Sequence, residues 1–141
     1  MRLVIDASVA VKWFLPEIHS RAAERLLNEA FELLAPDLIW SELGNVLWKR
    51  WRRGELAEHS ASEILTDFKR YPLLIYRSGP LLEDVWRLAA NLNRSFYDCV
   101  YLALAKTQEC PLVTADAKFF NALKNHRPWP PLIWVEEIKE R

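Results

Sequence analysis

Five short apolar segments constrain the fold of this chain more than any other feature of its sequence. They lie at residues 3–5, 33–35, 73–76, 112–113 and 132–135, and sequence with helical periodicity separates each from the next. A short, continuous apolar run of this kind is typical of a parallel strand that is buried on both faces. The alternation predicts an α/β fold: a three-layer α/β/α sandwich around a mostly parallel central sheet of about five short strands.

Capping residues and helix breakers predict where the intervening helices begin and end. We expect Ser8, Asp37 and Ser95 to cap three of them and Gly54 to end one. The expected helices cover residues 8–14, the segment SRAAERLLNEAFEL from residue 20, residues 38–53, 57–69, 80–92, 96–109 and about 116–124, and a short stretch after residue 135.

The composition fits a single domain that spans residues 1–141. Apolar residues make up 51% of the chain and there are only 3 glycines, which argues against disorder. The 19 Lys and Arg residues balance the 19 Asp and Glu residues, so the net charge neither favours nor excludes a nucleic-acid partner. Only a local patch could bind phosphate, and the densest basic segment is KRWRRG at residues 49–54.

Cys99 and Cys110 lie in apolar surroundings at a spacing that is typical of neither a zinc site nor a redox pair. We interpret both as buried free thiols, which predicts a reducing compartment and therefore the cytoplasm. Asp6 and Lys12 interrupt the first apolar run, which argues against a signal peptide. The longest uninterrupted apolar stretches are too short to span a membrane, so we expect no membrane association.

Two acidic residues come after predicted strands: Asp6 directly follows the first strand, and Asp116 lies three residues past Val113. In open parallel sheets, ligands bind outside the carboxyl ends of the strands. Each residue could instead be an ordinary turn or helix-capping Asp, so neither one identifies a site when it is taken alone.

Two further acids lie on predicted helices. Glu42 shares the inner face of its helix, or the edge of that face, with Ile39 and Val46, where a lone carboxylate is costly to desolvate. Asp98 lies in the first turn of a helix that is almost wholly apolar through Ala105. A surface position for Glu42 and a favourable interaction of Asp98 with the helix dipole are the competing interpretations.

The joint placement of these four acids is more informative than any one of them. Four carboxylates gathered at one end of a sheet repel one another, and divalent cations relieve that repulsion. Oxygen ligands without a nearby His or Cys suit Mg²⁺ or Mn²⁺. The three histidines, His19, His59 and His126, are scattered along the chain, so we interpret them as surface residues and do not expect zinc.

Four motifs, in this order and spacing, resemble the PIN-domain family of metal-dependent ribonucleases: VIDASV, SELGNVLWK, SFYDCVYLALA and LVTADAKF. Within that family the chain looks like a VapC-type toxin. The resemblance implies that the metal-binding, catalytic acids are Asp6, Glu42, Asp98 and Asp116, supported by Ser8, Asn45 and Thr114. One departure concerns the second metal site, because Lys118 stands where some relatives carry an additional acid.

The resemblance also implies an activity and partners. The activity is hydrolysis of RNA phosphodiesters that needs Mg²⁺ or Mn²⁺ and leaves 5′-phosphate and 3′-hydroxyl ends. The partners are a small cognate antitoxin and a second copy of the chain in a homodimer. The aromatic, basic helix around Trp48 and Trp51 is a reasonable docking surface, and we expect it to expose an apolar patch.

Substrate contacts must come from residues outside the acidic set. The basic candidates for contact with RNA phosphates are Lys12, Lys49, Arg50, Arg52, Arg53 and Arg94. Each of them could equally be a solvated charge near a helix end. We expect Tyr97, which precedes Asp98, to lie in the core, and contact with an RNA base is the alternative.

Other classes of protein remain open at this point. A magnesium-binding receiver-like signalling module shares the α/β pattern but would need paired acids after the first strand. A haloacid-dehalogenase-like phosphatase would need an acid two residues after Asp6, where Ser8 stands. A PIN-domain nuclease that processes RNA without being a toxin, and a PIN-like subunit that binds RNA without cutting it, are the nearest alternatives.

Overall fold

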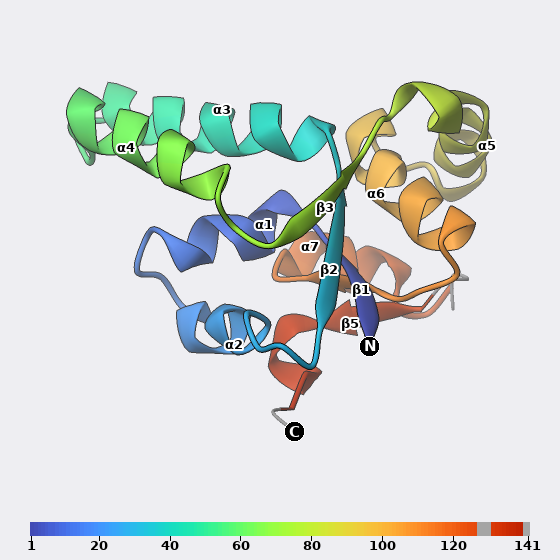
Figure 1. Ribbon diagram of the computed structural model, residues 1–141. Coiled ribbons are helices and arrows are strands. Elements are labelled where there is room, and N and C mark those ends of the chain that lie inside the picture. The colour runs from blue at the N-terminus through green and yellow to red at the C-terminus, as the bar shows by residue number, and fades with distance from the viewer. Residues whose placement is uncertain (127–130, 140–141) are drawn as a thin grey trace.

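The centre of the molecule is a five-stranded parallel sheet (Figure 1). The computed structural model describes residues 1–126 and 131–139. The strands follow the order β3-β2-β1-β4-β5, with bounds β1 (Arg2–Ile5), β2 (Glu32–Pro36), β3 (Leu73–Tyr76), β4 (Leu112–Thr114) and β5 (Leu132–Trp134). All five predicted strands are present, and the α/β prediction is confirmed.

The central strand β1 is buried on both faces. Leu3 pairs with Leu33 of β2, and Val4 pairs with Leu112 of β4. Leu3, Val4 and Ile5 are fully buried because helices cover both faces of the sheet at this strand. This explains why the strand is read from the sequence as a continuous apolar run rather than as an alternating one.

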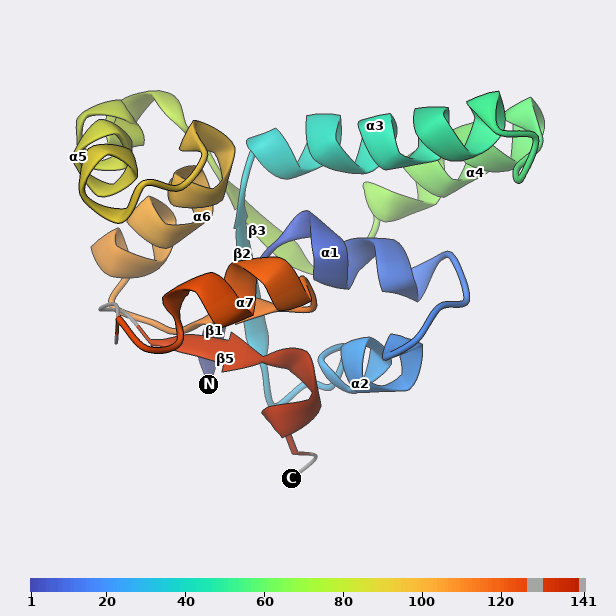
Figure 2. The ribbon, with the colours of Figure 1, turned by 180° about the vertical axis from the view of Figure 1, so that it is seen from behind.

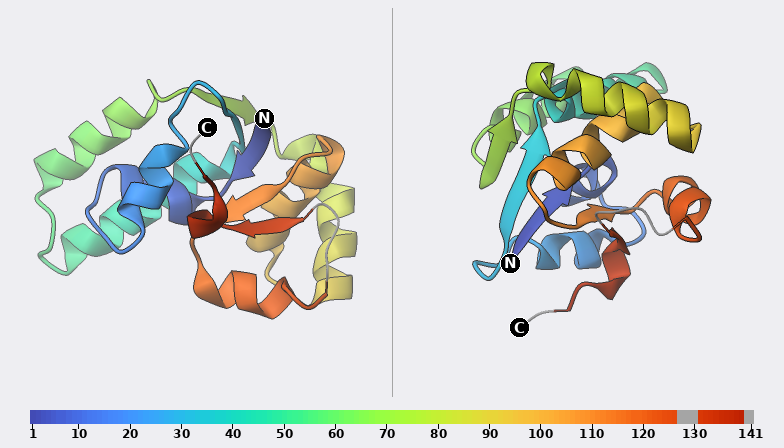
Figure 3. Two further views of the ribbon diagram at one scale, coloured as in Figure 1. Left: turned by 90° about the horizontal axis from the view of Figure 1, so that it is seen from below. Right: turned by 90° about the vertical axis from the view of Figure 1, so that its right-hand side faces the viewer.

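Helices connect every pair of successive strands. Their bounds are α1 (Ala7–Ala10), α2 (Ser20–Arg25), α3 (Leu38–Arg52), α4 (Glu58–Phe68), α5 (Leu82–Leu92), α6 (Phe96–Thr107) and α7 (Ala117–Leu123), with short 3₁₀ turns at Val11–Trp13, Gly79–Leu81 and Val135–Glu137. Helix α6 packs on β1 and β2, and α7 packs on β4 and β5. Figures 2 and 3 show α3 and α4 lying side by side as a helical hairpin.

Two expected helix boundaries and one expected helix cap are wrong. Asp6 caps α1 in place of Ser8, since its carboxylate accepts a hydrogen bond from the Val9 N–H. Helix α2 ends at Arg25, because the chain then turns tightly and the Asn28 side chain accepts from the Ala30 N–H before β2 begins. Asp37 precedes α3 without capping it, and its carboxylate instead accepts from the backbone and hydroxyl of Ser78.

Two other expectations concern the cysteines and membrane association. Cys99 and Cys110 are both buried and unbridged, as predicted. Within the described part of the chain, no helix combines the length and the apolar character needed to cross a bilayer.

Candidate active site

The four acids singled out from the sequence line one pocket of about 490 Å³ at the carboxyl ends of the strands. Asp6 follows β1, Asp116 follows β4, Glu42 lies in α3 and Asp98 lies in the first turn of α6. Ser8 and Asn45 line the same pocket, and Thr114 lies buried beside Asp6. The fold therefore brings together side chains from four distant segments.

Asp6 is the most constrained of these acids. Its side chain is only 7% exposed. The Ser8 hydroxyl donates to Oδ1 and the Thr114 hydroxyl donates to Oδ2, each at 2.5 Å. Ser8 itself accepts a hydrogen bond from the Ala115 N–H at 2.9 Å, which orients its own proton toward Asp6. Two hydroxyls thus fix the carboxylate from both sides.

Burial nevertheless dominates the electrostatics of Asp6. Desolvation raises the pKa of its carboxyl group from 3.8 to about 6, although the hydrogen bonds from Ser8, Thr114 and Val9 act in the opposite direction. The nearby Asp116 carboxylate adds a smaller increase. The position is unfavourable for an uncompensated negative charge, and a bound cation would relieve it.

Asp116 plays the helix-capping role that the sequence left open. Its Oδ1 accepts hydrogen bonds from the Lys118 and Phe119 backbone N–H groups, at 3.0 and 3.2 Å. Within residues 1–126 and 131–139, no hydrogen bond uses its Oδ2. The capping role leaves that second oxygen available, so it does not exclude binding of a ligand in the pocket.

Glu42 reaches the pocket from α3 and faces Tyr101 of α6. Burial raises the pKa of Glu42; the Tyr101 hydroxyl lowers it, and the Asp98 charge raises it further. The approach of the two groups falls short of a formed hydrogen bond. Glu42 Oε1 and the Tyr101 hydroxyl are both buried, and neither has a hydrogen-bond partner within the described residues.

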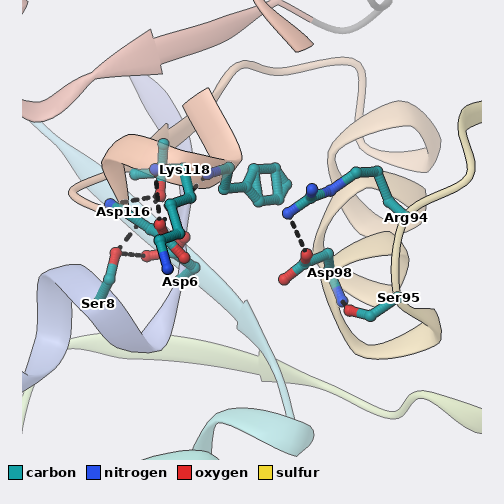
Figure 4. A network of polar contacts seen from close by, with 9 residues as sticks. Asp6, Ser8, Arg94, Ser95, Asp98, Asp116 and Lys118 are labelled. Atoms are coloured by element: carbon teal, nitrogen blue, oxygen red, sulfur yellow. Dashed lines mark hydrogen bonds and ion pairs between the residues drawn. The ribbon is translucent and has the colours of Figure 1, made fainter. Parts of the chain in front are cut away.

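Asp98 lies on the opposite wall of the pocket from Asp6 and Asp116, as Figure 4 shows. Its Oδ2 accepts a charged hydrogen bond from Arg94 at 3.0 Å. The Ser95 hydroxyl accepts from the Asp98 N–H and caps α6, as predicted. The guanidinium of Arg94 also stacks over the ring of Phe119, 5.5 Å from its centroid.

The donor set is oxygen-only, but the arrangement is open. Among residues 1–126 and 131–139, no three acidic, His or Cys side chains stand close enough together to hold a metal ion as they are arranged. The ligand roles of the four acids therefore stay predictions. The arrangement favours a hard divalent cation chemically, because one buried, two half-buried and one exposed acid border one pocket without a His or Cys among its lining residues.

The basic residues that we considered for contact with RNA phosphates differ in their exposure and in their partners. Lys49 is exposed and lines the pocket, and Arg53 is exposed at the end of α3. Arg50 is engaged with Glu17 and Glu55.

Two of the remaining candidates also have protein partners, and the third is buried. Arg52 lies over the Trp48 ring, and Arg94 pairs with Asp98. The expectation is wrong for Lys12, which is 7% exposed because the turn after α1 directs it inward.

Two aromatic residues of α6, Tyr97 and Tyr101, line the pocket. The expectation that Tyr97 lies in the core is wrong. Its side chain is 61% exposed and lines the pocket, because the buried part of α6 begins only at Cys99. Tyr101 was missed. Its spacing of three residues from Asp98 places both side chains on one face of α6, and that spacing could have revealed it.

A second hollow, of about 350 Å³, lies between α3 and α4. Trp48, Trp51 and Leu65 line it and are 54%, 41% and 39% exposed. The expected exposed apolar patch around Trp48 and Trp51 is therefore present. We call it the α3–α4 groove.

Comparison with known proteins agrees with this geometry. The PIN domain family model matches residues 3–124. Ribonuclease VapC3 of Pyrobaculum aerophilum is 37% identical over 118 residues, which cover 82% of this chain and 90% of that protein. The chain therefore belongs to the PIN-domain family, in its VapC group of ribonucleases.

Solved structures share the fold at low sequence identity. The crystal structure of VapC20 from Mycobacterium tuberculosis, described as a sarcin–ricin loop cleaving toxin, aligns with a TM-score of 0.68 at 15% identity, over 85% of this chain and 94% of that one. VapBC2 from Rickettsia felis, bound to a DNA fragment from its promoter, aligns with a TM-score of 0.64 at 16% identity, over 95% and 97%. The strand order also excludes a receiver-like module, whose sheet follows the order 2-1-3-4-5.

Proposed function

We propose that this chain is an endoribonuclease that hydrolyses RNA phosphodiesters with the help of Mg²⁺ or Mn²⁺, and that it is the toxin of a toxin–antitoxin pair. The observation that carries the proposal is the convergence of four acids on one pocket. Burial raises the pKa of two of them, Asp6 and Glu42, so the pocket favours an added positive charge. The similarity to Ribonuclease VapC3 supports RNA as the substrate class.

The residues present fit a divalent cation. Glu42 Oε1 is buried and has no hydrogen-bond partner among the residues that the structure describes, and the Asp6 carboxylate is desolvated. A bound cation would stabilise the charged form of each. The residues that would hold it are Asp6, Glu42, Asp98 and Asp116. A cation bound there would lower the pKa of a bound water and would stabilise the charge that develops on the oxygens of a phosphoryl displacement.

The residues around the acids orient them. Ser8 and Thr114 hold the Asp6 carboxylate in one rotamer through hydrogen bonds to its two oxygens. The first turn of α7 fixes Oδ1 of Asp116. Lys49 is exposed and lines the pocket from α3, which supports it as the residue that binds a phosphate of the substrate.

The proposed reaction is an in-line displacement at phosphorus. Water loses a proton and forms a new bond to phosphorus, the bond from phosphorus to the 3′ oxygen breaks, and that oxygen takes up a proton. The ribose 2′-hydroxyl takes no part. The products therefore carry 5′-phosphate and 3′-hydroxyl ends.

A cleavage assay tests this proposal. We expect the chain to cut RNA with added Mg²⁺ or Mn²⁺ and to stop when EDTA is added. Asp6→Asn should lower the rate more than about 100-fold, since even the outer partners of metal ligands contribute about 10–100-fold. The matched control is Asp67→Asn, which changes an exposed acid of α4 outside the pocket.

Two outcomes would contradict the reaction: cleavage that persists in EDTA, or products that end in cyclic phosphate. The toxin role has its own readout, which is growth arrest on expression of the chain that Asp6→Asn relieves. Cleavage without growth arrest would favour an RNA-processing nuclease instead.

We also propose that the partners are a small antitoxin and a second copy of the chain. A toxin–antitoxin complex from Klebsiella pneumoniae supports the antitoxin, since one chain of that complex shares this fold. The α3–α4 groove is a surface that suits a protein partner such as the antitoxin, because the side chains of Trp48 and Trp51 are exposed there. Aromatic residues of this kind are enriched at protein interfaces.

A further inference from the structure

Two buried polar groups that have no hydrogen-bond partner among residues 1–126 and 131–139 lie in the wall of the pocket. Tyr101 is only 3% exposed, and its hydroxyl has no hydrogen-bond partner in the described part of the chain. Glu42 Oε1 is buried and unpartnered in the same region. The two side chains come from α6 and α3 and line the same pocket.

The folded state is destabilised when two such groups form no hydrogen bond. A buried hydrogen-bonding group without a partner destabilises the fold, and it does so more strongly when it is charged. The Tyr101 hydroxyl can donate a proton, and a Glu42 carboxylate can only accept one. The two groups are therefore complementary, and they lie near enough for the hydroxyl to lower the pKa of Glu42.

The Asp6 side of the pocket shows what a completed arrangement looks like. There, the hydroxyls of Ser8 and Thr114 donate to a buried carboxylate and leave it fixed. Carboxylates that bind metal ions are generally held by such hydrogen bonds from residues behind them. Tyr101 is the hydroxyl that borders Glu42 in the corresponding way.

We propose that Tyr101 is a positioning residue whose hydroxyl donates to Glu42 and holds that carboxylate in the orientation in which it binds a divalent cation. The proposal rests on the proposed metal-dependent function. Tyr101 acts through Glu42, and it touches neither the RNA nor the reacting atoms. The hydrogen bond closes when Glu42 turns its other oxygen to the cation.

The test is a cation titration of Tyr101→Phe, which removes only the hydroxyl and keeps the ring. We expect Mn²⁺, followed by calorimetry or by the electron paramagnetic resonance of the free ion, to bind about 10–100-fold more weakly. Thermal unfolding in EDTA should be unchanged or shifted upward, because an unpartnered buried hydroxyl is removed. A purely structural role for Tyr101 would instead lower the unfolding temperature and leave the affinity for Mn²⁺ unaltered.

Two further variants make the result specific. In a Glu42→Gln background, Tyr101→Phe should add less than a twofold loss, because the group on which the hydroxyl acts is already altered. Tyr71→Phe is the matched control, since Tyr71 belongs to the aromatic cluster with Trp13 and does not line the pocket. It should bind Mn²⁺ as the unaltered chain does.

The outcomes separate this inference from the proposed function. Equal Mn²⁺ affinity of the unaltered chain and of Tyr101→Phe would overturn the role of Tyr101 while leaving the ribonuclease proposal intact. Additive losses from Tyr101→Phe and Glu42→Gln would also overturn it. If the unaltered chain bound no Mn²⁺ but Asp6→Asn still abolished cleavage, both the metal-dependent function and this inference would be wrong.

Discussion

The two walls of the acidic pocket are built differently. On the β1 and β4 wall, Asp6 is almost fully buried and accepts hydrogen bonds from two neutral hydroxyls. On the α6 wall, Asp98 is about one third exposed and is paired with a cation, Arg94. Neutral donors orient a carboxylate without compensating its charge, whereas a guanidinium orients it and also neutralises it. We infer that the first wall favours a metal ion, and that on the second wall Arg94 competes with a metal ion for Asp98.

The largest expected effect is on how the stability of the fold depends on pH, and it comes from the buried Asp6. The pKa of Asp6 is about 6 in the folded chain and 3.8 in the reference state, so this group destabilises the metal-free fold progressively as pH rises from about 4 to 6. The difference corresponds to about 3 kcal/mol of unfolding free energy. Asp6→Asn should remove this fall in stability, as measured by urea unfolding in EDTA between pH 4 and 7.

Glu42, whose pKa is also raised, contributes a fall of the same sign that Asp6→Asn leaves in place. Glu83→Gln serves as the control, because the Glu83 side chain is 92% exposed on α5. Parallel stability curves for Asp6→Asn and the unaltered chain would show that Asp6 is not desolvated in solution.

A smaller effect is expected from the hydroxyls that hold Asp6. Thr114→Val keeps the shape of a fully buried side chain but removes one of the two donors. We expect the affinity for Mn²⁺ to fall about 10–100-fold, and Ser8→Ala to act in the same direction. Calorimetric titration measures both variants, and unchanged affinities would remove the distinction between the two walls.

The smallest effect should have the opposite sign. Arg94→Gln removes the cation that pairs with Asp98, and pairs as exposed as this one contribute up to about 1 kcal/mol. We expect Mn²⁺ to bind up to about fivefold more tightly, because the guanidinium no longer competes for Asp98. Arg87→Gln, which changes an exposed ion pair of α5, is the control. Weaker binding in Arg94→Gln would mean that the guanidinium supports the site, as the hydroxyls do.

The convergence of the acids was accessible from the sequence because it follows from local rules. Asp6 and Asp116 come after strands of one parallel sheet, and the ends of such strands meet at one edge. Glu42 follows from helical periodicity, which places it beside the apolar face of α3. These arguments need only the type and the order of the elements.

The partners of the charged side chains were not accessible in the same way. Arg94 and Asp98 are four residues apart, a spacing that permits a contact but does not require one. Lys12 is buried because the chain tightens into a 3₁₀ turn after α1, and no residue pattern marks that change. The side on which Tyr97 lies depends on how α6 is rotated against the sheet, which is a property of packing.

The hydrogen bond between Thr114 and Asp6 joins residues 108 positions apart in the chain. During synthesis, β4 can take its place beside β1 only after the ribosome has released the chain through Thr114. Until then the Asp6 carboxylate lacks one of its two hydroxyl donors, and Asp116 is missing from the pocket. The acidic pocket is therefore a late product of synthesis, since its walls cannot assemble until segments more than 100 residues apart have both been made.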